Sequence, residues 1–322
     1  MNLDVYKEKF LSYLNEKVQL KEPENLYVPI KYILDLGGKR LRPILTLMTC
    51  DLFGGDSKKA LDAALAIEVF HNFTLIHDDI MDNAPIRRGK ITVHEKWDSN
   101  TAILSGDAMM IMASQLLETY ESSLFKPLVQ LFNKTALEVC EGQQYDVDFE
   151  TRNDVTIPEY LKMITFKTSV LVAAAMKMGA LIAEADEKES VAIYNYGLNL
   201  GIAFQLQDDY LDTYGDSETF GKQIGGDIIE NKKTFLYLKA LEKSNSEEKL
   251  RLFELFNSNI NSEDKIREVK DLYNKNLIPE IVKEQIQVYT DKAFECLSEL
   301  SVLEEKNQIL KEFGLNLMKR TI

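Results

Sequence analysis

Apolar residues recur along most of the chain at intervals of three and four, the spacing typical of α-helices that bury one face. Residues 57–82 are apolar on most sides, as expected of a central buried helix. Further helices are predicted at 3–20, 27–36, 101–121, 124–148, from Pro158 and at 186–212. Almost no run alternates apolar and polar residues between hairpin turns. The pattern predicts an all-α protein without a sheet.

Local signals refine two of these helices. Pro29 is compatible with the first turn of the helix at 27–36, and Gly37 and Gly38 are a stop signal at its end. The basic segment that follows, residues 39–43, is expected to form a loop. Residues 213–233 are rich in Gly, Asp and Lys and predict a second loop.

The chain has 322 residues, enough for one large domain that encloses a cavity. Proline is scattered singly, and no Pro-, Gly- or Ser-rich linker divides the sequence. We therefore expect a single domain over residues 1–322, with a central apolar cavity between its helices.

The net charge of -14, from 38 basic and 52 acidic residues, argues against nucleic acid or an anionic membrane as the main partner. Three widely spaced cysteines indicate neither a disulfide framework nor a zinc site. The most apolar run, 170–183, contains Lys177 and is too short to span a bilayer. We expect a cytoplasmic protein without a membrane span.

Candidate chemistry begins where the central helix ends, at Asp78, Asp79 and Asp82, followed by Arg87 and Arg88. At helical spacing, Asp78 and Asp82 share one face, and each unscreened pair of carboxylates costs roughly 2–3 kcal/mol at an effective dielectric near 20. A divalent cation would remove this cost, and oxygen ligands alone favour Mg²⁺. For one such motif in isolation, a solvated acidic helix end is the better interpretation.

The same spacing returns at Asp208, Asp209 and Asp212, again at the end of an apolar helical run. Two acidic motifs at helix ends can face each other across one cavity. Basic residues that could bind phosphate groups occur in the segments 37–43, 220–222 and 231–234.

This order of two aspartate motifs and three basic motifs resembles the trans-isoprenyl diphosphate synthases, from about residue 30 to residue 240. These head-to-tail prenyltransferases extend an allylic diphosphate with isopentenyl diphosphate. The resemblance implies an all-α isoprenoid-synthase fold, a homodimer, and about three Mg²⁺ ions, with Mn²⁺ as an alternative, held by the six aspartates.

The resemblance also implies two sets of substrate ligands. For isopentenyl diphosphate they are Lys39, Arg42, His71 and Arg88; His71 is seven residues before Asp78 and so on nearly the same helix face. For the allylic diphosphate they are Arg87, Lys167, Thr168, Gln205, Lys222 and Lys232. Together with the metal ligands Asp78, Asp82 and Asp208, we expect Lys167, Lys222 and Gln205 to be catalytic.

Product length in this family depends on bulk just before the first motif. Phe73, the fifth residue before Asp78, is the residue expected to form the floor of the cavity that receives the growing chain. Thr74, the fourth, departs from the paired aromatic residues of eukaryotic farnesyl synthases. Ideal helix geometry also admits Phe70, which is closer to the face of Asp78. We expect a short-chain product, geranylgeranyl (C20) in preference to farnesyl (C15) diphosphate.

Two other classes share parts of this pattern. A class I terpene cyclase also ionises a prenyl diphosphate, but it has no second substrate to use the loop at 37–43. A non-catalytic partner subunit would keep the fold and lose aspartates, whereas both motifs are intact here. Both alternatives explain the sequence less well.

Overall fold

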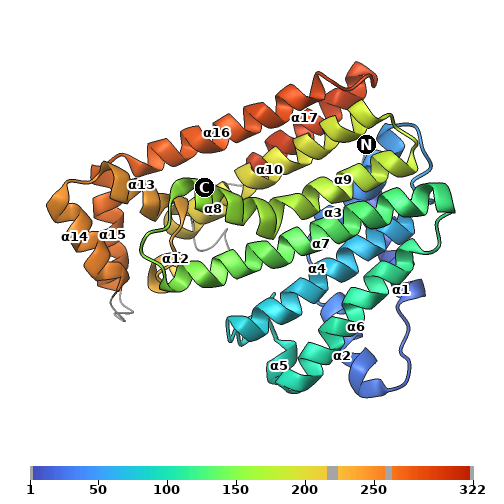
Figure 1. Ribbon diagram of the computed structural model, residues 1–322, viewed down its shortest axis with the longest axis horizontal. Helices are drawn as coiled ribbons and strands as arrows, with labels where there is room; N and C mark the ends of the chain where they lie inside the picture. Colours follow the sequence, from blue (N-terminus) through green and yellow to red (C-terminus); the bar gives the residue numbers. More distant parts are fainter. Residues whose placement is uncertain (1–2, 216–223, 258–262, 320–322) are drawn as a thin grey trace. The chain divides into compact units, whose positions relative to one another are not determined.

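The computed structural model describes residues 3–215, 224–257 and 263–319, and these are largely helical (Figure 1). They fall into two compact units, each made from separate stretches of the chain: Met1–Ala136 with Ala174–Tyr194, and Leu137–Ala173 with Asn195–Ile322. The all-α prediction is confirmed. A single domain with a central apolar cavity stays a prediction.

Helix α4 is the centre of the first unit. It packs against α3 and α6 (Figure 1), and its buried residues include three alanines in the first two turns, which allow neighbouring helices to come close. The helices that belong wholly to this unit are α1 (Leu3–Lys17), α2 (Glu24–Asp35), α3 (Leu41–Leu52), α4 (Leu61–Met81), α5 (Val93–Lys96) and α6 (Ser99–Leu117).

The second unit contains most of the later helices, and three long helices contribute residues to both units. The three are α7 (Ser122–Thr151), α9 (Val170–Ile182) and α10 (Glu187–Tyr214). The others are α8 (Ile157–Ile164), α12 (Gly226–Ile229), α13 (Phe235–Lys243), α14 (Ser246–Phe256), α15 (Glu263–Lys275), α16 (Ile278–Leu297) and α17 (Glu304–Met318). Capping boxes at Thr156 and Asn245 fix the starts of α8 and α14.

Several sequence predictions need correction. Helix α2 begins at Glu24, so Pro29 lies inside the helix and not in its first turn. Pro29 has no N–H to donate within the helix, and its ring is buried together with Ile30, Ile33 and Leu34. Val5, an apolar residue of the helix predicted at 3–20, is exposed.

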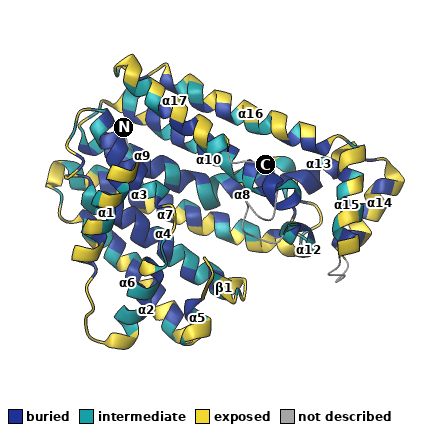
Figure 2. Ribbon diagram, turned by 180° about the vertical axis from the view of Figure 1, so that it is seen from behind, coloured by how far each residue is buried: buried dark blue, intermediate teal, exposed yellow. Residues whose placement is uncertain are grey.

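The predicted absence of a sheet is wrong at one place, directly after the first aspartate motif. Strands β1 (Ile86–Arg87) and β2 (Lys90–Ile91) pair antiparallel, with Arg87 opposite Lys90. Arg88 and Gly89, with φ of 52° and 73°, form the two-residue turn, and positive φ at both positions is the requirement of a type I′ hairpin. Figure 2 shows this hairpin at the surface. Strands of two residues are too short to be predicted from the alternation of apolar and polar residues.

A second correction concerns the helix that starts at Pro158. It is interrupted by a five-residue π-helical turn, η1 (Thr165–Ser169), and continues as α9. Together, Ile157–Ile182 are long and apolar enough for a membrane span by length and composition. The most apolar stretch is 61% buried inside the protein, as in a core helix, so this is weak evidence for a span. All three cysteines are free thiols.

Candidate active site

Asp78, Asp79 and Asp82 lie in the last turn and at the C-cap of α4, and they differ in exposure. Asp79 is buried, with 1% of its side chain exposed, whereas Asp82 is exposed. Arg87, from strand β1, donates from Nε to Asp79 Oδ1 at 2.7 Å, and its Nη2 lies 3.6 Å from Asp78 Oδ2. The hairpin therefore places Arg87 against the aspartates, as an arginine that bridges metal ligands and phosphate would require.

Burial raises the pKa of Asp79, and the neighbouring charge of Arg87 offsets part of this rise. The second oxygen, Oδ2, is buried and accepts no hydrogen bond from the described part of the chain. An ionised carboxylate with one unsatisfied buried oxygen suits a hard cation, so this residue fits a metal ligand.

The carboxylates do not form a ready-made metal cage. Within residues 3–215, 224–257 and 263–319, no three His, Cys, Asp or Glu side chains are grouped closely enough to hold an ion. Mg²⁺ usually keeps several waters and combines one or two carboxylates with substrate phosphates. The first motif is suited to a cation that arrives with a diphosphate.

In the basic segment after α2, Arg40 and Arg42 have different environments. Arg40 is buried, with φ of 53°, and its guanidinium donates to Glu68 of α4 and to the carbonyl of Leu34. It anchors the segment and is not available to a substrate. Arg42 lies in the first turn of α3, with Nη1 3.2 Å from His71 Nε2, while Lys39 is exposed. The helix starts at Leu41, so Arg42 is not in the predicted loop.

Arg88 reaches the same segment from the hairpin. It donates to the carbonyl of Gly37, and its guanidinium carbon lies 2.9 Å from the position that a Cβ on Gly38 would occupy. Gly38, at φ of 116°, is therefore needed both for the backbone and for the arginine. The first unit thus brings three of the four predicted isopentenyl diphosphate ligands to one segment: Arg88 contacts residue 37, and Arg42 contacts His71.

The predicted floor residues also differ in burial. Phe70 is fully buried, with ring centroids 5.4 Å from Phe132 and 5.5 Å from Phe73. Phe73 is partly buried and packs edge-on against His77 at 4.7 Å. The hydroxyl of Thr74 donates to the carbonyl of His71 at 2.8 Å, so it is held by its own helix.

In the second unit, a chain of hydrogen bonds joins η1 to the second aspartate motif. Thr168 donates to Gln205 Oε1 at 3.2 Å, and Gln205 Nε2 donates to Asp209 Oδ1 at 3.0 Å. Tyr160 donates to the other oxygen of Asp209. Burial and the charge of Asp227 raise the pKa of Asp209 well above its usual value. These hydrogen bonds bring Thr168, Gln205 and Asp209 together, and they add Tyr160 to the group.

Lys167 forms an ion pair with Asp146 of α7, with Nζ 2.5 Å from Oδ2. The pairing shows a specific partner: Asp146 holds a lysine that the sequence assigned to the allylic diphosphate.

Asp212 is tied to α12. Its Oδ2 accepts a hydrogen bond from the backbone N–H of Asp227 at 2.9 Å, at the start of α12. Lys232 lies 3.7 Å from Asp227 Oδ1 and 2.7 Å from Glu230 Oε2, and Lys265 of α15 donates to the neighbouring Asn231 at 2.6 Å. The predicted ligand Lys222 lies outside the described residues.

Comparison with known proteins places these features in a family. A family model described as polyprenyl synthetase matches residues 23–274. The geranylgeranyl diphosphate synthase of Methanosarcina mazei is 44% identical over 71% of this chain and 72% of its own length. A geranylfarnesyl diphosphate synthase of Natronomonas pharaonis is 41% identical over 71% of this chain and 73% of its own length.

The chain belongs to the polyprenyl synthetase family. A crystal structure of a geranylgeranyl pyrophosphate synthase has a TM-score of 0.95 and 53% identity, and covers 100% of both chains. A more distant polyprenyl synthase, from Caulobacter crescentus and complexed with calcium and isoprenyl diphosphate, has a TM-score of 0.87 and 28% identity over 99% of this chain and 96% of its own. This protein is thus a prenyltransferase with the isoprenoid-synthase type of fold, as the sequence predicted, and its family generally uses divalent metals.

Two polar partners in this site could not be predicted from the sequence. Tyr160 is fully buried and its hydroxyl bonds to Asp209 across 49 residues of sequence. Glu68 neutralises Arg40 across 28 residues. In the sequence, each of these residues is only a polar side chain inside an apolar helical run. Such a residue has many possible structural roles, so neither partner could be identified.

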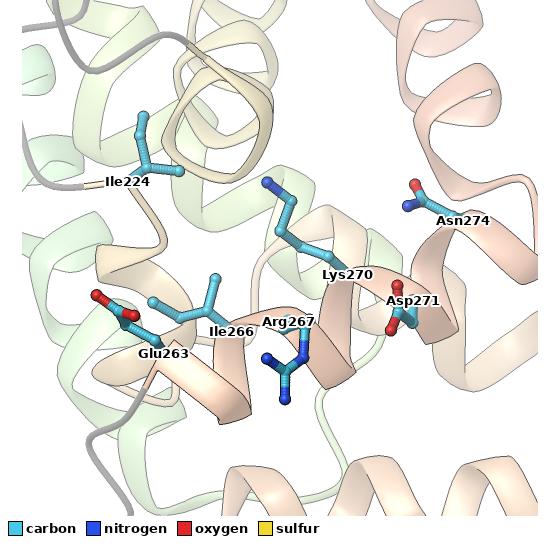
Figure 3. A pocket seen from close by; sticks show the side chains of 7 residues that line it. All are labelled: Ile224, Glu263, Ile266, Arg267, Lys270, Asp271 and Asn274. Carbon is cyan, nitrogen blue, oxygen red and sulfur yellow. The ribbon is translucent and has the colours of Figure 1, made fainter.

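One cavity of about 380 Å³ in the second unit lies along α15 (Figure 3). Its described lining residues are Ile224, Glu263, Ile266, Arg267, Lys270, Asp271 and Asn274. Figure 3 shows that all except Ile224 come from α15. Two acidic and two basic side chains balance each other, which does not favour an anionic diphosphate there.

Proposed function

We propose that this enzyme is a Mg²⁺-dependent head-to-tail prenyltransferase that condenses isopentenyl diphosphate with allylic diphosphates and releases a short-chain product. The observation that carries the proposal is the buried, half-satisfied carboxylate of Asp79 beside Arg87. It combines a cation ligand with a phosphate ligand, the pair that an ionising diphosphate needs.

The isopentenyl diphosphate ligands are Lys39, Arg42, His71 and Arg88. A diphosphate carries two to three negative charges, and the arginines present fork-shaped donors to its oxygens. His71 accepts a hydrogen bond from Arg42 and so orients that guanidinium. These contacts hold the double bond of the substrate ready for attack.

The allylic diphosphate ligands are Arg87, Lys167, Thr168, Gln205, Lys222 and Lys232. When bound, Mg²⁺ held by the six aspartates would neutralise the charge that develops on the leaving diphosphate. Lys167 and Lys232 add fixed positive charge to the same group, and apolar helix faces exclude water from the allylic cation. Isopentenyl attack forms the new carbon–carbon bond, and the proton that is lost passes to the departing diphosphate.

For the product we propose geranylgeranyl diphosphate (C20) in preference to farnesyl diphosphate (C15). Phe73 supports a short-chain limit because it is a bulky, partly exposed side chain five residues before Asp78. The names of related proteins support C20 and also include a C25 synthase. A C25 product would require the tail to pass Phe73.

The reaction is tested by incubating the purified chain with Mg²⁺, isopentenyl diphosphate and geranyl or farnesyl diphosphate. We expect a longer linear diphosphate, identified by chromatography after dephosphorylation. A cyclic hydrocarbon would indicate a terpene cyclase, and no turnover by the chain alone would indicate a partner subunit; either result refutes the proposal. We also propose a cytoplasmic homodimer, a location that three free thiols support.

A further inference from the structure

The π-helical turn η1 is packed against two glycines of the second unit. Gly142 of α7 faces the backbone of the turn: a Cβ there would lie 2.2 Å from the nitrogen of Lys167 and 2.6 Å from the carbonyl carbon of Phe166. Gly201 of α10 faces its other end, where a Cβ would lie 2.8 Å from the Cα of Ser169. Real Cβ atoms do not make contacts this short, so both positions admit only glycine unless the backbone moves.

Four residues after each glycine, on the same helix, lies a polar residue whose side chain binds a side chain of η1. On α7, Asp146 follows Gly142 by four residues and pairs with Lys167. On α10, Gln205 follows Gly201 by four residues and accepts the Thr168 hydroxyl at 3.2 Å. Residues four apart lie on one helix face. Each helix therefore supplies a close backbone approach and a side-chain partner.

The turn itself has the wider hydrogen bonding of a π-helix. The N–H of Val170 bonds to the carbonyl of Thr165, five residues earlier, and the hydroxyl of Ser169 donates to the carbonyl of Ile164 at 3.4 Å. A π-bulge adds a residue to the turn and changes the directions in which the following side chains project. Lys167 and Thr168 thus depend on this turn for their placement.

We propose that Gly142 and Gly201 are positioning residues for the allylic diphosphate, and that Asp146 orients the ammonium group of Lys167. The two glycines fix the π-helical turn between α7 and α10. Asp146 and Gln205 then set the directions of Lys167 and Thr168. This inference rests on the proposed function, because it takes the allylic substrate as the ligand of Lys167 and Thr168.

The test compares Gly142→Ala, Gly201→Ala and Asp146→Asn with wild type. We expect kcat to fall on the order of 100-fold in the glycine variants, because a displacement of about 1 Å is enough for such a loss. We expect the Michaelis constant for geranyl diphosphate to rise about tenfold in all three, while that for isopentenyl diphosphate stays within about twofold. Asp146→Asn keeps the side-chain shape, so it tests the proposal even where an added methyl group prevents folding.

Gly314→Ala is the matched control. Its Cβ would lie 2.9 Å from the Phe294 ring, also in the second unit, but it touches neither η1 nor its partners. We expect it to leave both Michaelis constants unchanged. Equal rises for the two substrates in the test variants, or the same change in Gly314→Ala, would overturn the positioning role and indicate a general packing defect.

Binding of geranyl thiodiphosphate, an unreactive allylic analogue, with Mg²⁺ separates this inference from the proposed function. If wild type binds the analogue but forms no product, the proposed reaction fails, and calorimetry still tests whether Asp146→Asn weakens binding about tenfold. If wild type turns over and Lys167→Ala weakens allylic binding but Gly142→Ala and Asp146→Asn do not, only the positioning role fails. If wild type does not bind the analogue, both fail.

Discussion

Arg42 donates a hydrogen bond from Nη1 to His71 Nε2 at a distance of 3.2 Å. Arginine has no acceptor atom, so the histidine nitrogen must be the acceptor and the ring must be neutral, with its proton on Nδ1. Burial, followed by the charges of Arg42 and Arg88, lowers the pKa of His71 well below its ordinary value. The geometry and the direction of the shift agree.

This pair predicts a pH dependence of stability. Below pH 6.5 the unfolded chain protonates His71 and the folded chain does not, so the unfolded state binds more protons and stability falls as the pH falls. Between pH 6.5 and 5.5 we expect a loss of about 1 kcal/mol from this residue. Denaturant unfolding of wild type and His71→Asn at both pH values measures it. Buried carboxylates are common to both chains and cancel in the difference. An identical pH dependence of the two chains would show that folding does not lower the pKa of His71.

Asp78→Asn should separate metal binding from folding. The variant removes a ligand and also one charge beside Asp79, so we expect turnover to fall by orders of magnitude while metal-free stability stays within about 0.5 kcal/mol or rises. Wild type should gain thermal stability from Mg²⁺ with inorganic diphosphate, because both bind only the folded state. We expect the same loss of turnover and the same metal-free stability for Asp208→Asn. Near-normal turnover in either variant would disprove the metal assignment.

The two diphosphates should respond to different lysines. Lys39→Ala is expected to raise the Michaelis constant for isopentenyl diphosphate more than that for the allylic substrate, and Lys232→Ala to do the reverse, each about tenfold. Lys249→Ala, an exposed lysine on α14, is the control. Steady-state kinetics with each substrate varied in turn gives both Michaelis constants for each variant and for wild type. Equal effects on both substrates would contradict separate sets.

Product length should change most cleanly in Phe73→Ala. Phe73 is partly buried, so its removal opens space at moderate cost and should shift the product beyond C20. Phe70 is fully buried against Phe132, and Phe70→Ala should cost about 3–5 kcal/mol as well as extend the tail. Chromatography of dephosphorylated products, with thermal melts alongside, compares the two. A wild-type product beyond C25, or unchanged lengths in both variants, would refute the floor assignment.

The homodimer is testable at α6. Leu104 and Ile111, seven residues apart on this helix, are each 60% exposed, which is unusual for large apolar side chains on one helix face. We expect light scattering to give twice the chain mass of 36.9 kDa, and Leu104→Glu with Ile111→Glu to give the monomer mass. A wild-type monomer would refute the prediction.

The sequence by itself determined the elements and the type of chemistry. The 3.6-residue period predicted α4, α6, α7 and α10, because a helix that buries one face must repeat its apolar positions. The two aspartate motifs and the basic segment could also be recognised in the sequence, because the residues of each group lie within five positions of one another. Local spacing was sufficient for both.

Only the tertiary structure decided how these residues are held. Arg40 and Arg42 are two positions apart and look equivalent in sequence, but Glu68 makes one of them an internal anchor. Lys167 pairs with Asp146, 21 residues away, and Asp209 accepts a hydrogen bond from Tyr160, 49 residues away. The π-helical turn exists where Gly142 and Gly201 admit the backbone of η1. These features come from contacts between helices distant in sequence, and no periodicity within one helix records which partner it will meet.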